Sequence, residues 1–263
     1  MRRVPVPAIA FVVGLGGLAG LAGLASAHVA PSTSDNNRYL KLTPLGDRVR
    51  LAYTVFYGEI PGAELRRTLD ANHDGAIDDA ESGAFGDRIA HELAAALEVT
   101  VDGAPWPVAW SQVVVGLGTP RTAAGTFSID LVASICLARP RGTHQVLIRD
   151  RFQLARPGET QIRFEDSPGV KLDRARVGDD TAPGIDYTII GPTPVLGAAG
   201  PEGGIELGFT AGATAVVASD AACRPGATPG GGSLGALAAA AGALVAGAGG
   251  VILARRARRR RRS

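Results

Sequence analysis

Residues 70–81 read DANHDGAIDDAE, and every ligand position of this run has the residue type of a helix-loop-helix calcium loop. Oxygen-bearing side chains stand at loop positions one, three, five, nine and twelve: Asp70, Asn72, Asp74, Asp78 and Glu81. Gly75 stands at position six, where the loop turns sharply. The run therefore predicts two helices joined by a tightly curled loop.

Calcium explains this spacing, because the ion takes 6 to 8 oxygen ligands. Ala76 at position seven would contribute only its backbone carbonyl, Asp78 would act directly or through water, and Glu81 would supply both carboxylate oxygens. We expect a calcium site made by six residues: Asp70, Asn72, Asp74, Ala76, Asp78 and Glu81. The alternative is a degenerate loop that survives only as a turn.

The segments on either side of the loop have helical periodicity. Residues 63–69 carry Leu65 and Leu69 four apart, and apolar residues recur at the same spacing after the loop at Phe85, Ile89, Leu93 and Leu97. We expect an EF-hand insertion over residues 61–98. The sequence contains no second calcium loop, so we expect Ile77 at position eight to have no pairing segment and the affinity to be weak, at ~10⁻⁴ to 10⁻³ M.

The two ends of the chain predict export and membrane anchoring. Arg2 and Arg3, the apolar residues 8–24 and the small residues 25–27 have the pattern of a signal peptide over residues 1–27. Residues 234–254 carry no charge, are long enough to span a ~30 Å hydrocarbon core, and precede the arginine-rich tail 255–263. Because positive residues stay inside, we expect a single-pass protein of the bacterial cell envelope with residues 28–224 outside the cytoplasm.

Removing these ends reverses the net charge. The whole chain carries +2, but two of its 27 basic residues lie in the signal segment and seven in the tail. The exported part keeps 18 basic residues beside 25 acidic ones, a net charge of about −7. An acidic domain repels nucleic acid and suits a divalent cation, so no nucleic-acid partner is expected.

Short alternating segments predict a mainly β exported domain. Residues 39–42 and 49–56, with a Pro-Leu-Gly-Asp turn between them, indicate a hairpin. Further strands are expected over residues 97–101, 106–115, 126–138, 143–154, 160–164, 184–190 and 205–217. We expect a β-sandwich that carries the EF-hand as an insertion.

Residues 225–233 read PGATPGGGS and are expected to form a flexible tether. Together, the tether, the apolar segment and the arginine cluster resemble bacterial C-terminal sorting tails of the GlyGly type. The resemblance implies a membrane protease or sorting enzyme as a partner and cleavage within residues 230–233. A plain single-span anchor fits the same residues.

The two cysteines, Cys136 and Cys223, are expected to face an oxidising compartment. A disulfide between them is one expectation. Lipid attachment at Cys223, as in some sorting tails, is the other.

The sequence does not predict an enzyme. Residues 231–235 match the nucleophile pattern GxSxG but have no histidine downstream, and the glycines of residues 14–20 lie in the signal segment. His73 at loop position four should point to solvent, and His91 and His144 have no partner that the sequence identifies.

His28 would become the first residue after cleavage, where a free amine beside an imidazole can chelate copper or nickel. The residues Asn37-Arg38-Tyr39, the strand 49–53 and Glu59-Ile60-Pro61 resemble the exported N-terminal domain of bacterial nickel/cobalt transporters of the NicO and HupE/UreJ kind. The resemblance covers residues 28–115 and implies a metal permease as partner. This chain departs from the family in two ways: the multi-span permease is missing, and the expected mature start reads His28-Val29-Ala30 instead of His-Pro-Leu.

These patterns support two functions. The first is a membrane-anchored, calcium-stabilised structural or interaction module. The second is an accessory that presents His28 to nickel, cobalt or copper.

Overall fold

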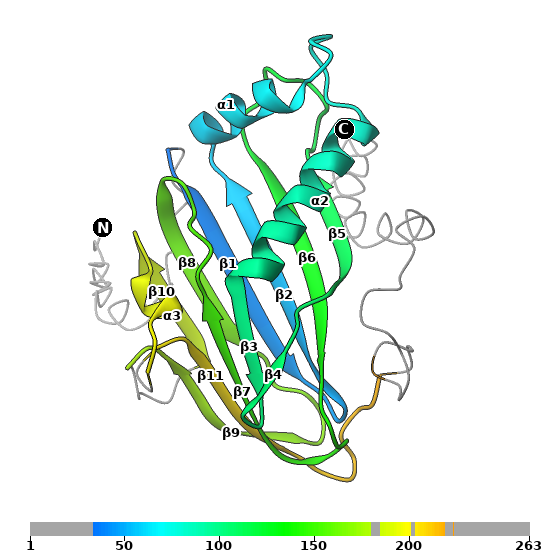
Figure 1. Cartoon of the computed structure of the whole chain (residues 1–263), viewed down its shortest axis with the longest axis vertical. Coiled ribbons are helices and arrows are strands. Elements are labelled where there is room, and N and C mark those ends of the chain that lie inside the picture. The colour runs from blue at the N-terminus through cyan, green and yellow to red at the C-terminus, as the bar shows by residue number, and fades with distance from the viewer. Residues whose placement is uncertain (1–33, 180–184, 201–202, 219–222, 224–263) are drawn as a thin grey trace, which may run out of the picture. The chain divides into compact units, whose positions relative to one another are not determined.

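A computed structural model of the 263-residue chain describes residues 34–179, 185–200, 203–218 and 223 (Figure 1). Within that part of the chain the protein is mainly β, as the sequence predicts. Its strands form two sheets, and three helices accompany them.

The larger sheet has six strands in the spatial order β10-β8-β1-β2-β6-β5. Their bounds are β1 Asn36–Pro44, β2 Arg48–Tyr57, β5 Trp110–Gly116, β6 Phe127–Cys136, β8 Pro157–Phe164 and β10 Asp186–Ile190. The predicted hairpin is the β1–β2 pair, which is antiparallel over its whole length. β1 and β8 pair in parallel, whereas the other neighbours in this sheet are antiparallel.

The smaller sheet has five strands in the order β4-β3-β7-β11-β9. Their bounds are β3 Leu97–Val101, β4 Ala104–Trp106, β7 Gly142–Asp150, β9 Val170–Val177 and β11 Ile205–Ala211. The inward residues of both sheets belong to one apolar core, to which β2 contributes Leu51, Tyr53 and Val55 and β11 contributes Leu207 and Phe209. Strands β1, β2 and β6 alternate buried and more exposed residues over most of their length, because successive side chains point to opposite faces.

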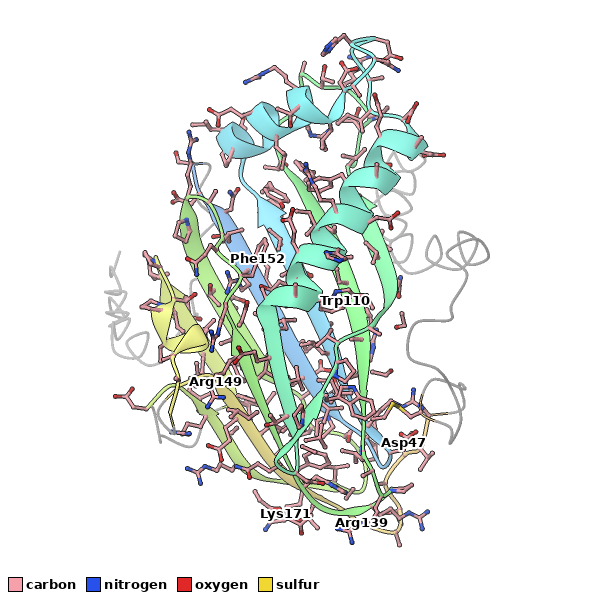
Figure 2. The ribbon with its side chains drawn as sticks, viewed as in Figure 1. Asp47, Trp110, Arg139, Arg149, Phe152 and Lys171 are labelled. Atoms are coloured by element: carbon pink, nitrogen blue, oxygen red, sulfur yellow. A yellow bond between two sulfur atoms is a disulfide. The ribbon has the colours of Figure 1, made fainter. Side chains whose placement is uncertain are left out.

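Helices α1 (Glu59–Leu69) and α2 (Asp79–Ala96) follow one another between β2 and β3, and the short α3 (Pro194–Gly197) precedes β11. Near its N-terminal end α2 packs on the larger sheet through Phe85, whose ring lies 6.0 Å from that of Tyr57 and 5.8 Å from that of Phe127. Further along, Trp110 lies against α2 (Figure 2) and its Nε1 donates to the Ala90 carbonyl at 2.9 Å. Since α2 runs directly into β3, the helix is held by both sheets.

Several strand expectations were wrong in detail. The strand expected over 143–154 ends at Asp150, and the one expected over 205–217 ends at Ala211. Residues 106–115 form parts of β4 and β5 and not one strand, with Pro107, which lacks an N–H donor, in the break. β9 was not expected at all. It lies at the edge of its sheet and, among the described strands, pairs only with β11, so most of its side chains are exposed or half-buried. Its apolar alternation, Val170 with Leu172 and Ala175 with Val177, is interrupted between Leu172 and Arg174, where the register with β11 shifts.

Among the described residues, no helix combines the length and the apolar character needed to cross a bilayer. The predicted signal segment 1–27, tether 225–233, membrane helix 234–254 and tail 255–263 lie outside the described residues.

Candidate metal centre

The chain between α1 and α2 has the course that the loop sequence predicts. α1 ends at Leu69, and Asp70 follows as its C-terminal cap. Asp78 caps the start of α2: its side chain accepts from the Glu81 N–H at 2.8 Å, while the Glu81 side chain accepts from the Asp78 N–H at 3.0 Å. Loop positions nine and twelve therefore also form the capping box of the second helix.

The first half of the loop is held by its own side-chain oxygens. The Asp70 carboxylate accepts from the N–H groups of Asp74 (3.1 Å) and Gly75 (3.0 Å). Asn72 Oδ1 accepts from Asp74 N–H at 2.9 Å, and Asp74 Oδ1 accepts from Ala76 N–H at 2.9 Å. Each of these three side chains therefore folds back onto the backbone of the loop.

Glu81 reaches across the loop from the opposite end. Its Oε1 accepts from the N–H groups of Ala71 (2.7 Å) and Asn72 (3.3 Å). The carboxylate of position twelve thus lies beside positions two and three, which brings the two ends of the loop together.

Gly75 has a φ of 87°, which lies in the left-handed region. An added Cβ would meet no atom within 4 Å, so the backbone angle and not crowding favours glycine at position six. His73 also has a positive φ, 60°, and its side chain is exposed, as the sequence predicts.

Among the described residues, no three His, Cys, Asp or Glu side chains are close enough together to form a metal-binding group. In the loop, carboxylate oxygens of Asp70, Asp74 and Glu81 accept from backbone N–H groups. The donor set still fits calcium, since it consists of hard oxygens at alternate loop positions. Both carboxylate oxygens of Glu81 accept from N–H groups, so binding an ion through this residue would require it to exchange these donors for the ion.

Ile77 has a pairing segment, contrary to expectation. Its N–H donates to the Pro120 carbonyl at 2.7 Å, and the Thr122 N–H donates to the Gly75 carbonyl at 3.1 Å. These two bonds flank an antiparallel bridge between Ala76 and Arg121. We call residues 117–126, which join β5 to β6, the pairing loop. It takes the place that a second calcium loop would have.

The bridge also orients the carbonyl at loop position seven. The two hydrogen bonds are made by the neighbours of Ala76 and Arg121 and not by these two residues themselves. In an antiparallel pair of this kind, the N–H and C=O of the two opposed residues point away from the partner segment. The Ala76 N–H accordingly points back to Asp74. By the same pattern the Ala76 carbonyl is turned away from the pairing loop and is available as the ligand of position seven.

Arg66 in α1 holds the pairing loop in place. Its side chain is fully buried, and its guanidinium donates only to backbone carbonyls: those of Leu117, Thr119 (2.8 Å), Arg121 (3.1 Å), Gly125 (3.2 Å) and Thr126 (3.1 Å). It also lies 5.2 Å from the centre of the Phe127 ring. Burial lowers the pKa of Arg66 below its ordinary value. One side chain thus ties α1 to the segment that pairs with the calcium loop.

A second contact between α1 and the pairing loop depends on glycine. A Cβ on Gly62 would lie 2.5 Å from the Gly125 carbonyl oxygen, and a Cβ on Gly125 would lie 2.6 Å from the Glu59 side chain. Neither Arg66 nor these glycines could be assigned to the site from the sequence, because helical periodicity alone does not show which loop a helix contacts.

The other predicted site residues lie away from the loop. The structure joins Cys136, at the end of β6, to Cys223 by a disulfide with a Cα–Cα distance of 5.4 Å. His28 lies outside the described residues, and His91 is exposed on α2. His144 is buried and has two partners, the Asp102 carboxylate (2.8 Å) and the Arg141 carbonyl (2.7 Å), so it tightens the turn between β3 and β4 against β7.

No protein-family model matches the chain, and no curated protein matches it. The candidate function therefore rests on the residues and their geometry.

Proposed function

We propose that this chain is a calcium-binding structural or interaction module of the bacterial cell envelope, with the ion held by the loop of residues 70–81. The ligands would be the side chains of Asp70, Asn72, Asp74, Asp78 and Glu81 and the carbonyl of Ala76. No catalytic role is proposed.

The observation that carries this proposal is the bridge between Ala76 and Arg121. A loop that survives only as a turn would not need a second segment to hold its backbone. Here the pairing loop holds Ile77, which is 2% exposed, and turns the Ala76 carbonyl away from itself, toward the side where an ion would bind. Because the backbone is already ordered before the ion binds, less conformational entropy is lost on binding. We therefore expect a dissociation constant below ~10⁻⁴ M, tighter than the sequence alone suggests.

The role of the ion would be structural. Four carboxylates of the ligand set lie within twelve residues of one loop, and bringing them together around one centre costs repulsion unless a cation is bound there. Calcium would offset that repulsion and hold α1, α2 and the pairing loop together. The exported, membrane-anchored location rests on the terminal segments and is part of the proposal.

Thermal unfolding of the purified full-length chain in mild detergent, with and without calcium, tests this function. At a hundredfold excess over the dissociation constant, mass action adds about 2.7 kcal/mol, a rise in melting temperature of a few degrees. Asp70→Ala should remove most of the rise. Asp79→Ala, which removes an exposed carboxylate at the non-ligand position ten, should keep it. Equal shifts in both variants would exclude the loop as the site.

The alternative role of His28 in binding nickel, cobalt or copper stays a prediction, since no described residue bears on it.

A further inference from the structure

The described part of the chain ends beside the end of β6. Cys223, the last described residue, is joined by the disulfide to Cys136, the last residue of that strand. Residues 212–218, which follow β11 and which we call the strap, precede it. The strap is bound to the turn between β1 and β2, because the Gly46 N–H donates to the Val216 carbonyl at 2.7 Å. This end of the domain is therefore the one from which the expected tether begins, and we call it the strap end.

The calcium loop lies at the other end of the same strands. β6 begins at Phe127, directly after the pairing loop, and β2 runs in the opposite direction from Arg48 to Tyr57, the residue that precedes Gly58 and α1. Each of the two strands has ten residues, so at ~3.3 Å per residue their ends are about 30 Å apart. Figure 1 shows the turn from α1 to α2 at the end away from the strap.

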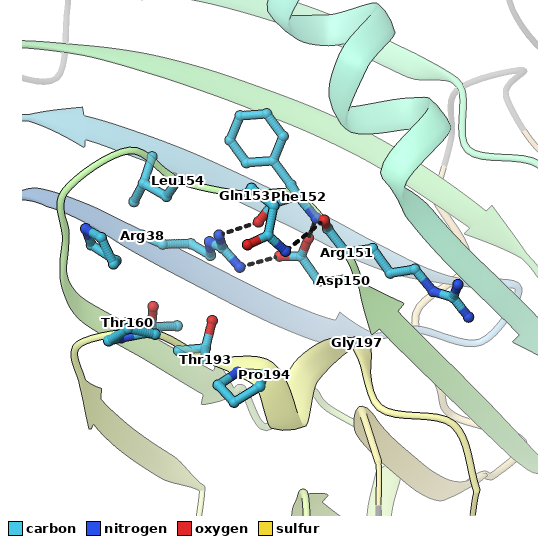
Figure 3. A pocket seen from close by; sticks show the side chains of 12 residues that line it. Arg38, Asp150, Arg151, Phe152, Gln153, Leu154, Thr160, Thr193, Pro194 and Gly197 are labelled. Atoms are coloured by element: carbon cyan, nitrogen blue, oxygen red, sulfur yellow. Dashed lines mark hydrogen bonds and ion pairs between the residues drawn. The ribbon is translucent and has the colours of Figure 1, made fainter.

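A buried ion pair joins the two sheets between these ends (Figure 3). Arg38 on β1 donates to the Asp150 carboxylate on β7 at 2.7 Å, and the two side chains are 3% and 0% exposed. The Tyr53 hydroxyl on β2 donates to the same carboxylate at 2.8 Å. Because the sheets share this network and one apolar core, the direction in which the strap end faces also fixes the direction of the calcium loop.

The strap presents two neighbouring apolar side chains to solvent. Val216 and Val217 are 46% and 49% exposed. Burying such side chains at the boundary between lipid headgroups and acyl chains is favourable, as it is for other proteins that lie on a bilayer.

Exposed arginines flank the strap. The Arg141 N–H donates to the Gly46 carbonyl at 2.7 Å, so the loop between β6 and β7 lies against the same turn as the strap. The side chains of Arg139 and Arg141 in this loop are exposed. Figure 2 shows Arg139 at the same end of the domain as Asp47 and Lys171.

Three carboxylates at the strap end already have partners. They are Asp47 with Arg48, Asp173 with Lys171, and Asp102 with His144, each pair 2.8 Å apart. Asp166, between β8 and β9, is exposed beside them. The two arginines therefore leave an excess of positive charge among the described residues of this end. The calcium loop at the other end carries five acidic side chains: Asp70, Asp74, Asp78, Asp79 and Glu81.

We propose that the strap end docks on the surface of an anionic lipid bilayer through Val216, Val217, Arg139 and Arg141, so that the calcium loop points away from the membrane. This inference rests on the membrane-anchored location in the proposed function and not on calcium binding. Arginines near an anionic surface are attracted to it, whereas the acidic loop is repelled. Charge and apolar exposure thus favour the same orientation.

The length of chain beyond Cys223 fits this orientation. Ten residues, 224–233, separate it from the expected membrane helix. They span at most about 36 Å when fully extended, and about 17 Å on average as the flexible chain that their sequence predicts. Because the disulfide ties Cys223 to β6, such a tether keeps the strap end, and not the calcium loop, beside the bilayer.

The test follows valine methyl groups by NMR in the full-length chain, reconstituted into nanodiscs that contain a lipid with a nitroxide on its headgroup. Discs of phosphatidylglycerol mixed with phosphatidylcholine supply the anionic surface, and discs of phosphatidylcholine alone are the comparison. The nitroxide broadens the signals of methyl groups close to it. Val216 and Val217 should broaden more in the anionic discs than in the neutral ones. Val114, a valine of β5 that is 41% exposed near the calcium loop, should stay sharp in both.

Substitution of the arginines separates docking from the nearness that the tether alone imposes. The double variant Arg139→Gln and Arg141→Gln keeps the tether and both valines. Its ratio of docked to undocked chain should fall about fivefold for each charge removed, so the broadening in anionic discs should drop toward that in neutral discs. The double variant Arg67→Gln and Arg121→Gln, which removes two exposed arginines at the calcium-loop end, should broaden as the wild type does. Melting temperatures check that both variants fold.

Several results would overturn the docking. Equal broadening in the two kinds of disc, or no effect of the variant at Arg139 and Arg141, would show that the anionic surface does not hold the strap end. Absence of broadening at both strap valines would leave the strap to solvent or to a protein partner, and broadening of Val114 alone would reverse the orientation. A chain that does not enter the discs would overturn the anchor and the docking together, while calcium titration of the same protein would still decide the calcium loop.

Discussion

The N–H of Ile77 donates to the carbonyl of Pro120 across 2.7 Å, which joins the calcium loop to a hairpin loop of the β-sheet. A helix-loop-helix of this kind would otherwise need a second copy of itself to pair at position eight. Here the connection between β5 and β6 supplies the pairing, and Arg66 fixes that connection from the other side. Calcium binding and the packing of α1 on the sheet are therefore expected to be coupled.

Loss of the Arg66 side chain should loosen the pairing loop. Arg66→Met leaves five partly buried carbonyls without this donor, so we expect a loss of about 3 to 5 kcal/mol in the free energy of unfolding without calcium. Calcium affinity should fall as well, because the loop would have to order on binding. Denaturant unfolding and calcium titration check both effects. Arg67→Met, the exposed neighbour, should change neither, and equal behaviour of the two variants would contradict the role of Arg66.

Calcium should slow hydrogen exchange in the pairing loop as well as in the calcium loop. The amides of Ile77 and Thr122 donate the two bonds of the bridge, so both should gain protection when the ion orders the loop. Exchange followed by NMR, with magnesium as the control ion, measures this. If only the Ile77 amide responds and Thr122 does not, the two loops are not coupled.

The disulfide should contribute strongly to stability. It closes a segment with a sequence separation of 87, and a loop of that length corresponds to about 4 to 5 kcal/mol in the chain-entropy model. The double variant Cys136→Ser and Cys223→Ser should therefore unfold at a markedly lower denaturant concentration. A thiol assay on the unfolded, unreduced wild type should find no free thiol; two free thiols would show that the pair does not form.

Acid should weaken the contact between Asp102 and β7. Burial alone would raise the pKa of Asp102, but hydrogen bonds from the Gln145 N–H and from His144 outweigh it, so the pKa lies below the ordinary value of 3.8. A carboxyl with a lowered folded pKa stabilises the protein above its ordinary pKa, and this stability is lost as the pH falls through the folded pKa.

Asp102→Asn removes the titrating group and suits the site, because Asn tolerates the positive φ of 51° found there. The melting temperature of the wild type should exceed that of the variant near neutral pH, and the difference should shrink below about pH 4. Because the Asp102 side chain is 38% exposed, the difference should be small. If the difference in melting temperature between the wild type and Asp102→Asn stays the same from neutral to acid pH, Asp102 makes no such contribution.

The sequence predicts the elements of this fold better than their contacts. The period of Phe85, Ile89 and Leu93 locates α2, and all three side chains are buried as that period requires. Pairing of Ile77 with Pro120 could not be predicted, because periodicity reports which face is buried and not which distant segment covers it. The same holds for Arg38 and Asp150, which are brought together only by the facing of the two sheets.

Isothermal titration of the full-length chain with calcium tests the central claim most directly. We expect one site with a dissociation constant below ~10⁻⁴ M in the wild type. Glu81→Gln, which removes the charge of the closing ligand, should weaken binding at least about tenfold, whereas Glu92→Gln, on the exposed side of α2, should not. Absence of binding at millimolar calcium, or equal affinity in Glu81→Gln, would show that residues 70–81 do not hold the ion.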